Sequence, residues 1–318
     1  MKPRINTDEN DRGCHPEFIS GSQTTRNKEM LKRVQHDIYQ KKILRSIIIQ
    51  ALQEDIGSGD ITTKLTIPVK ENSIAHIIAK QDGVLAGKDV VQQVFKILDP
   101  NVKLKFKVED GEKFKQGQII AELKGNTRAL LTGERTALNF LCRLSGIATL
   151  TRKFIDQVSH TKVKIFDTRK TTPNLRILEK YAVKIGGGTN HRLGLYDMIL
   201  IKDNHIQASE GIANAIKRAQ VGNKSELLIE VETKNISEVK QALALKVPWI
   251  MLDNMNLKQI KQAVKLAKGQ AKLEVSGGVN LKNVRKIAET GVDYISVGAL
   301  THSAPIIDIS MEIRKANF

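Results

Sequence analysis

Residues 166–206 read FDTRKTTPNLRILEKYAVKIGGGTNHRLGLYDMILIKDNHI, and this stretch predicts the fold of the chain around it. It begins where a short apolar run ends in the polar residues Asp167 to Lys170. A helix is expected next, because Pro173 suits a first helical turn and a run of three glycines ends the helix. A second apolar run, residues 198–201, then ends in Lys202 to His205. Both runs are typical of strands that end in charged side chains.

The alternation of apolar runs and helical patterns continues from residue 163 to the end of the chain. Six runs end in polar residues, and helical spacing of apolar side chains follows them. Strands that alternate with helices of about 10–15 residues indicate parallel βα units. Six such units favour a barrel, complete or partial, over an open sheet, which stays an alternative. Helices are expected over residues 209–219, 236–245, 257–267 and 281–289.

The chain before residue 163 predicts a smaller domain of helices and strands. Apolar and partly alternating runs indicate half-buried strands, with residues 61–63 leading toward the first of them. Residues 130–154 predict one or two buried helices, and the polar residues 1–40 have the composition of a disordered extension. Strands are expected over residues 73–81, 103–109 and 119–123, and helices over 43–54 and 89–98.

The chain is strongly basic. Its 318 residues include 51 Lys and Arg against 34 Asp and Glu, a formal net charge of +17. That charge raises a nucleic-acid-binding protein as an alternative, because phosphate contacts depend on Lys and Arg. Aromatic residues make up only 4% of the chain, however, and neither zinc-finger spacing nor an RNP motif occurs. Many lysines also fall on helical stretches that predict a solvated face. We therefore expect no nucleic-acid partner.

Cysteine use and hydropathy bear on the compartment. Cys14 and Cys142 lie far apart, so no disulfide framework is expected. No apolar run approaches the roughly 20 residues that span a bilayer, and the N-terminal residues lack the apolar core of a secretory signal. We expect a cytoplasmic protein without a membrane partner.

Strand ends meet at one mouth of a barrel, and active sites of such barrels lie there. The ends predicted here carry cations, two carboxylates and two glycine-bearing turns. Arginines pair with carboxylates or phosphates, carboxylates near a phosphate suit Mg²⁺, and glycine turns expose N–H groups to an anion. The pattern predicts a small, multiply anionic substrate. The residues concerned are Arg169, Lys170, His191, Arg192, Lys202, Glu232, Asp253, Ser276, Gly277 and Gly298.

Several ordered motifs resemble those of one family. They are EDIGSGDITT at residues 54–63, GERTALN at 133–139, DTRKTTP at 167–173, GGG and NHR within 186–192, KDNH at 202–205, LDN at 252–254 and GALTHS at 298–303. In this order they resemble quinolinate phosphoribosyltransferase, the decarboxylating pentosyltransferase of NAD biosynthesis. The resemblance covers all but about the first forty residues. We expect that extension to affect function little.

The resemblance implies an α/β protein of two domains. An N-terminal α/β sandwich is expected over residues 41–150, with a C-terminal helix returning to it, and an incomplete, TIM-like α/β barrel over residues 151–318. The resemblance also implies a homodimer, with a hexameric assembly of dimers as a further expectation. In the dimer, the sandwich of one subunit covers the barrel mouth of its partner, so Arg135 would reach the partner's substrate.

The same resemblance divides the expected site into groups by ligand. Arg135, Arg169, His191, Arg192 and Lys202 are expected around the two carboxylates of quinolinate. Lys170 is expected near the substrate and pyrophosphate, and Glu232 and Asp253 near the ribose hydroxyls and Mg²⁺, which they hold directly or through water. Ser276, Gly277 and Gly298 are expected at the 5′-phosphate. The expected catalytic residues are Lys170, Lys202, Glu232 and Asp253, and Mg²⁺ is the expected cofactor.

The implied reaction moves the phosphoribosyl group of phosphoribosyl pyrophosphate to the nitrogen of quinolinate. The 2-carboxylate is lost, giving nicotinate mononucleotide, pyrophosphate and CO₂. Two enzymatic alternatives stay open. One is a related phosphoribosyltransferase that acts on another pyridine or heterocyclic acid, and the other is a phosphate-binding barrel in which Lys202 forms a Schiff base.

Overall fold

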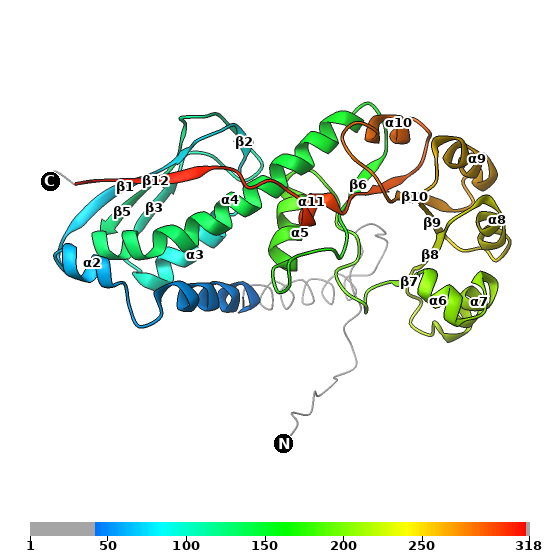
Figure 1. Ribbon diagram of the computed structural model, residues 1–318, viewed down its shortest axis with the longest axis horizontal. Coiled ribbons are helices and arrows are strands. Elements are labelled where there is room, and N and C mark those ends of the chain that lie inside the picture. The colour runs from blue at the N-terminus through cyan, green and yellow to red at the C-terminus, as the bar shows by residue number, and fades with distance from the viewer. Residues whose placement is uncertain (1–41, 316–318) are drawn as a thin grey trace, which may run out of the picture.

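The computed structural model describes residues 42–315, so the extension expected over residues 1–40 lies outside the described chain. Two sheets lie at opposite ends of an elongated molecule and are joined by the long helix α4, Thr127–Val158 (Figure 1). None of the helices within residues 42–315 is both long and apolar enough to cross a membrane.

The first sheet is antiparallel, with the strand order β12-β1-β5-β3. Ala75, Ile77 and Ala79 alternate along β1 and are fully buried, because every second side chain of a strand points to the same face. Helices α3 and α4 cover one face of this sheet (Figure 1). The elements here are a helix described over residues 42–56, α2 Ile61–Thr66, β1 Asn72–Ala79, β2 Gly83–Val84, α3 Lys88–Leu98, β3 Lys103–Phe106, β4 Lys113–Phe114, β5 Ile119–Asn126 and β12 Ile309–Lys315.

Two expectations for this part of the chain are wrong. Residues 61–66 form a helix rather than an approach to a strand, because the side chain of Asp60 caps it by accepting the N–H of Thr63 at 2.9 Å. The chain does return to the first sheet at its C-terminal end, but as strand β12 and not as a helix. The physical reason is the period of two in residues 309–313, in which Ile309 and Met311 are buried.

The second sheet is parallel, with the order β6-β11-β10-β9-β8-β7. Strand β11, the last of this sheet in chain order, pairs with β6, the first, so the strands form a ring that is open between β6 and β7. This is the incomplete α/β barrel that the sequence predicts, and the predicted fold class is confirmed. Its elements are β6 Lys164–Phe166, α5 Arg176–Ile185, β7 Ile199–Ile201, α6 Asp203–Ala208, α7 Ile212–Gly222, β8 Ile229–Thr233, α8 Ile236–Ala244, β9 Trp249–Asp253, α9 Leu257–Ala267, β10 Lys272–Ser276, α10 Val284–Ala288, β11 Tyr294–Ser296 and α11 Ala299–His302.

Two expected barrel helices have other bounds in the structure. The helix expected over residues 209–219 begins at Ile212, as α7, because Glu210 and Gly211 take positive φ values of 59° and 126° between α6 and α7. A helix cannot continue through such backbone. The helix expected over residues 281–289 is shorter, α10 at Val284–Ala288, whereas α8 lies where apolar spacing predicts it and α9 matches its expected bounds.

Helix α4 packs against both halves of the molecule, and residue 150, the expected domain boundary, lies inside it. Gly146 lies so near the segment after α11 that an added Cβ would come within 2.1 Å of the Pro305 carbonyl oxygen. The guanidinium of Arg143 pairs with the buried carboxylate of Glu179 on α5 at 2.9 Å. These contacts fix the barrel against the helix that also covers the first sheet.

Candidate active site

The parallel strands place most of the predicted site residues at one mouth of the barrel. Glu232, Asp253 and Ser276 lie at the carboxyl ends of β8, β9 and β10. Arg169 and Lys170 follow β6, Lys202 follows β7 and Gly298 follows β11. His191 and Arg192 lie in the segment that crosses the opening between β6 and β7, which begins with a bridge between Phe166 and Thr189.

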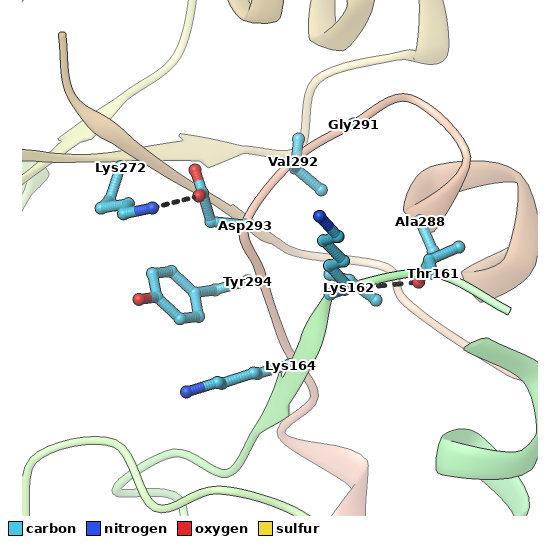
Figure 2. A pocket seen from close by; sticks show the side chains of 10 residues that line it. Thr161, Lys162, Lys164, Lys272, Ala288, Gly291, Val292, Asp293 and Tyr294 are labelled. Carbon is cyan, nitrogen blue, oxygen red and sulfur yellow. Dashed lines mark hydrogen bonds and ion pairs between the residues drawn. The ribbon is translucent and has the colours of Figure 1, made fainter. Parts of the chain in front are cut away.

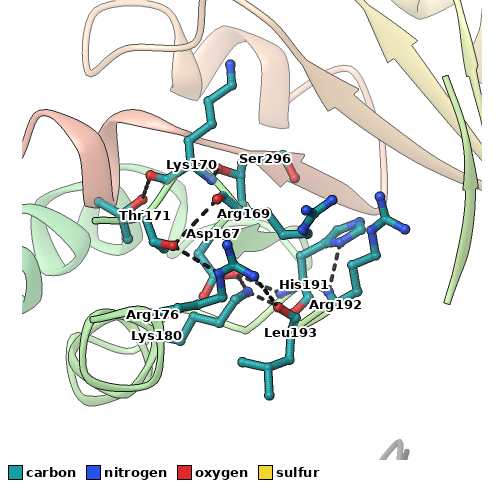
Figure 3. A network of polar contacts seen from close by, with 12 residues as sticks. Asp167, Arg169, Lys170, Thr171, Arg176, Lys180, His191, Arg192, Leu193 and Ser296 are labelled. Atoms are coloured by element: carbon teal, nitrogen blue, oxygen red, sulfur yellow. Dashed lines mark hydrogen bonds and ion pairs between the residues drawn. The ribbon is translucent and has the colours of Figure 1, made fainter. Parts of the chain in front are cut away.

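Cations gather at this mouth without acidic partners. In Figure 3 the side chains of Arg169 and Arg192 extend to the same side of the network. Burial lowers the pKa of Arg192, and the nearby charge of Arg169 lowers it further. Within residues 42–315, no ion pair involves Arg169, Lys170, Arg192 or Lys202. The mouth therefore has an excess of positive charge.

A buried ion pair supports the segment that carries these cations. Lys180 on α5 and Asp167 after β6 pair in the core, with side chains 2% and 0% exposed. The carboxylate of Asp167 also accepts the backbone N–H of His191 at 2.9 Å, and Lys180 donates to the carbonyl of His191 at 2.9 Å (Figure 3). Burial raises the pKa of Asp167 to about 6, although Lys180 opposes that shift. The pair thus fixes the backbone just before Arg192.

Two carboxylates, Glu232 and Asp253, lie near each other at the mouth on the adjacent strands β8 and β9. Burial raises the pKa of Glu232, and the charge of Asp253 raises it further, while Lys202 lowers it. Asp253 accepts a hydrogen bond from the side-chain amide of Asn254 at 2.9 Å. Neighbouring carboxylates that repel each other are a suitable oxygen donor set for a divalent cation such as Mg²⁺.

The turns after β10 and β11 expose backbone to the same mouth. Gly277 and Gly278 have φ values of 90° and 63°, a region that favours glycine. A Cβ on Gly277 would lie 2.2 Å from the side-chain oxygen of Asn254. A Cβ on Gly298 would lie 3.3 Å from the side chain of Lys170, which shows that Lys170 lies against this turn. Glycine lets Asn254 and Lys170 approach the backbone of these turns, and beside Gly278 the space is open, with nothing within 4 Å of an added Cβ.

Sequence analysis did not assign a role to two buried carboxylates inside the barrel. The Nε2 atom of His191 lies 3.0 Å from Glu230 and 3.5 Å from Glu274, and both carboxylates are fully buried. Burial and the charge of Glu274 raise the pKa of Glu230 to about 7. The period of two in a strand could have indicated their position. It places Glu230 on the same strand face as Glu232, and Glu274 on the same face as Ser276.

Arg135 is the predicted site residue that lies away from the barrel mouth of its own chain. It is exposed on α4, beside the first sheet. Among the described residues, no hydrogen bond or ion pair connects it with the barrel, and its charge acts on Glu134 and Cys142. A single chain therefore does not bring Arg135 to its own barrel mouth.

A cavity of about 550 Å³ lies at the opposite end of the barrel strands. Figure 2 shows Lys164, Lys272 and Tyr294, which begin strands β6, β10 and β11, around it. Lys272 is paired there with Asp293 at 2.7 Å. This cavity is separate from the cation-rich mouth, so we do not assign the site to it.

Comparisons with known proteins agree on one family. Residues 60–145 match the N-terminal domain of quinolinate phosphoribosyl transferase, and residues 147–312 match the C-terminal domain. The chain is 44% identical to quinolinate phosphoribosyltransferase [decarboxylating] 2a, mitochondrial, of Nicotiana tabacum, covering 85% of this chain and 82% of that protein. It is 43% identical to a probable nicotinate-nucleotide pyrophosphorylase [carboxylating] of Bacillus subtilis, covering 86% and 94%. The solved nicotinate-nucleotide pyrophosphorylase of Francisella tularensis is 42% identical and superposes with a TM-score of 0.81 over 86% of this chain and 96% of that one.

We predict that Lys180→Met destabilises the protein, because it leaves Asp167 buried without its partner. The free energy of unfolding in urea should fall by about 3–5 kcal/mol, the usual cost of breaking a buried pair. Lys184→Met, on an exposed position of the same helix, is the control and should change stability little. Adding Asp167→Asn to Lys180→Met should restore part of the loss. A Lys180→Met variant as stable as the wild type would contradict this account of the segment.

Proposed function

The chain belongs to the quinolinate phosphoribosyltransferase family, and we propose that its barrel mouth transfers a phosphoribosyl group from phosphoribosyl pyrophosphate to quinolinate in NAD biosynthesis. The products would be nicotinate mononucleotide, pyrophosphate and CO₂. One observation carries the proposal: the cations at the mouth make no ion pair within residues 42–315. Two substrates that are both multiply anionic would neutralise them.

The arginines suit the dicarboxylate. Arg169 lies close enough that its charge acts on Arg192, and a planar guanidinium pairs with a carboxylate through two hydrogen bonds. A substrate with two adjacent carboxylates would relieve this repulsion more fully than a monocarboxylate. Lys202 adds a third cation on the side of the carboxylates Glu232 and Asp253. The arrangement therefore favours quinolinate over a pyridine acid with a single carboxylate.

The other end of the mouth suits phosphoribosyl pyrophosphate. In the glycine turn after β10 the backbone is open to a phosphate at Gly278, and Lys170 lies against the turn at Gly298. Glu232 and Asp253 would hold Mg²⁺, directly or through water. When bound, Mg²⁺ neutralises charge that develops on a pyrophosphate leaving group. The raised pKa of Glu232 fits that assignment, because a nearby cation would offset its repulsion from Asp253.

The side chains then act mainly by position and charge. As pyrophosphate leaves, positive charge develops on the ribose, and Lys170 would stabilise the departing anion while Glu232 and Asp253 stabilise the ring or orient its hydroxyls. The pyridine nitrogen attacks the ribose and becomes cationic. Loss of CO₂ from the adjacent carbon leaves a carbanion beside that cation, and a proton replaces the carboxylate. Arg169 and Arg192 hold the ring in place throughout.

The alternatives are less well supported. Schiff-base lysines are usually desolvated, whereas Lys202 is exposed at the mouth. The family match favours the enzyme over a nucleic-acid-binding protein, for which the net charge of +17 is the supporting observation. A homodimer in which Arg135 completes the partner's site is part of this proposal, and so is Mg²⁺. A cytoplasmic location stays a prediction, since the Nicotiana tabacum relative is named as mitochondrial.

We predict that Glu232→Gln and Asp253→Asn each raise the Mg²⁺ concentration needed for half-maximal turnover by about tenfold, because each removes one anionic oxygen ligand. A Mg²⁺ titration of initial rates at saturating quinolinate and phosphoribosyl pyrophosphate measures this. Glu312→Gln, on the exposed side of β12, is the matched control and should leave the titration unchanged. An unaltered Mg²⁺ requirement in both site variants would remove these carboxylates from the metal site.

We also predict that two inactive variants complement each other if Arg135 acts across subunits. Arg135→Ala and Arg192→Ala should each abolish most quinolinate turnover while keeping the fold. Mixed one to one with subunit exchange, about a quarter of all sites would be intact, because half of the dimers are hybrids and each hybrid has one complete site. Activity should therefore return to about 25% of the wild-type value. No recovery with proven exchange would show that Arg135 does not act across subunits.

A further inference from the structure

His191 is the predicted substrate ligand whose geometry fits that role least. Its side chain is only 7% exposed, and both ring nitrogens already have partners inside the protein. Nε2 faces Glu230 at 3.0 Å and Glu274 at 3.5 Å. Nδ1 lies 2.8 Å from the backbone nitrogen of Arg192, whose N–H points at it (Figure 3). No ring nitrogen is left for a carboxylate of a ligand.

These contacts specify one tautomer of the ring. A neutral imidazole has one donor and one acceptor. The N–H of Arg192 needs an acceptor, so the lone pair must be on Nδ1 and the ring proton on Nε2, where it faces the carboxylates. Burial lowers the pKa of His191, but Glu230 and Glu274 raise it to about 10, which by itself favours an imidazolium. A second ring proton, however, would lie on Nδ1 and point at the N–H of Arg192, so this contact opposes an imidazolium.

The same reasoning bears on metal binding. His191, Glu230 and Glu274 bring ligand atoms within 4.8 Å of one another, as a metal site would. A metal needs the lone pair of Nε2, and the ring proton would then move to Nδ1 and meet the Arg192 N–H. The hydrogen bond to Arg192 therefore favours a proton on Nε2 over a metal ion.

The surroundings hold the ring from several sides. Phe166 packs edge-on against it with ring centroids 5.6 Å apart, and Trp249 lies 6.3 Å away in a similar orientation. Ser296 donates to Glu274 at 2.5 Å, which fixes one of the two carboxylates. An imidazole so enclosed keeps its orientation when the mouth is filled or emptied.

We propose that His191 is a positioning residue for Arg192: Glu230 fixes the imidazole through its hydrogen bond with Nε2, the charge of Glu274 lies beside it, and Nδ1 accepts the backbone N–H of Arg192. The guanidinium of Arg192 then extends toward the mouth, held by its hydrogen bond to the Met198 carbonyl at 3.1 Å. The buried carboxylates thus act on substrate binding without touching the substrate. That consequence rests on the proposed function, whereas the tautomer is a property of the free protein.

Two substitutions at residue 191 separate positioning from direct binding. His191→Asn keeps an acceptor at the δ position for the Arg192 N–H but has no group at the ε position. His191→Gln keeps a polar group at the ε position and loses the δ acceptor. Positioning through Nδ1 predicts that Gln raises the KM for quinolinate about tenfold, as expected for the loss of one buried hydrogen bond, whereas Asn raises it only about threefold, because the acceptor stays but Glu230 and Glu274 no longer hold it. The kcat and the KM for phosphoribosyl pyrophosphate should change little in both.

The reverse order, with Gln close to the wild type and Asn impaired, would overturn the proposal, because it is the order expected of a ligand bound through Nε2. Equal and large losses in both variants would also contradict it. Thermal unfolding of each variant shows whether a loss is one of folding. Nitrogen-15 NMR of the histidine rings in the full-length protein tests the tautomer without turnover, with His191→Asn identifying the resonance.

The spectrum of the free protein should show a neutral ring protonated on Nε2, unchanged when quinolinate is added. An imidazolium, or a ring whose Nδ1 carries the proton, would overturn the inference. Failure of this inference can be distinguished from failure of the proposed function. A protein that shows the expected tautomer but does not turn over quinolinate would contradict the proposed function alone.

Discussion

Electrostatic repulsion between cations at the barrel mouth is the constraint on which the site depends. Two unit charges about 6 Å apart interact by on the order of 3 kcal/mol at an effective dielectric constant of about 20. Elsewhere in the barrel such a cost is avoided: the buried cation Lys180 pairs with Asp167, and Arg143 pairs with Glu179. Arg169 and Arg192 have no such pair among the described residues. A bound polyanion supplies the negative charge that these arginines lack, so the unliganded mouth favours anionic substrates.

The layers below the mouth explain how this arrangement is held. Stacked aromatic rings of Phe166, Tyr294 and Trp249 fill the barrel near its opposite end. Above them lie Glu230 and Glu274, which hold the ring of His191. Two positions further along the same strands, β8 and β10, Glu232 and Ser276 lie at the mouth. The strand period of two thus connects a rigid interior with the groups that meet the substrates.

The sequence predicts much of this arrangement, because apolar runs with polar ends specify both the strands and the edge where they end. Asp253, Ser276 and Glu232 could be placed at one mouth on that basis. The pair of Lys180 and Asp167 could not, because their contact depends on how α5 returns to β6. Helix α2 was missed although Asp60 offers an N-cap, and strand β12 was missed because its partner β1 is over two hundred residues away in the chain. The role of His191 depends on which nitrogen each neighbour faces, and no pattern of residue types contains that information.

The most direct test of the central claim is a product analysis with quinolinate labelled at the 2-carboxylate, phosphoribosyl pyrophosphate and Mg²⁺. The account predicts nicotinate mononucleotide, pyrophosphate and labelled CO₂ in equal amounts, and little turnover when nicotinate replaces quinolinate. A product that keeps the label, or nicotinate used as readily as quinolinate, would contradict the claim that paired cations select a dicarboxylate at this mouth.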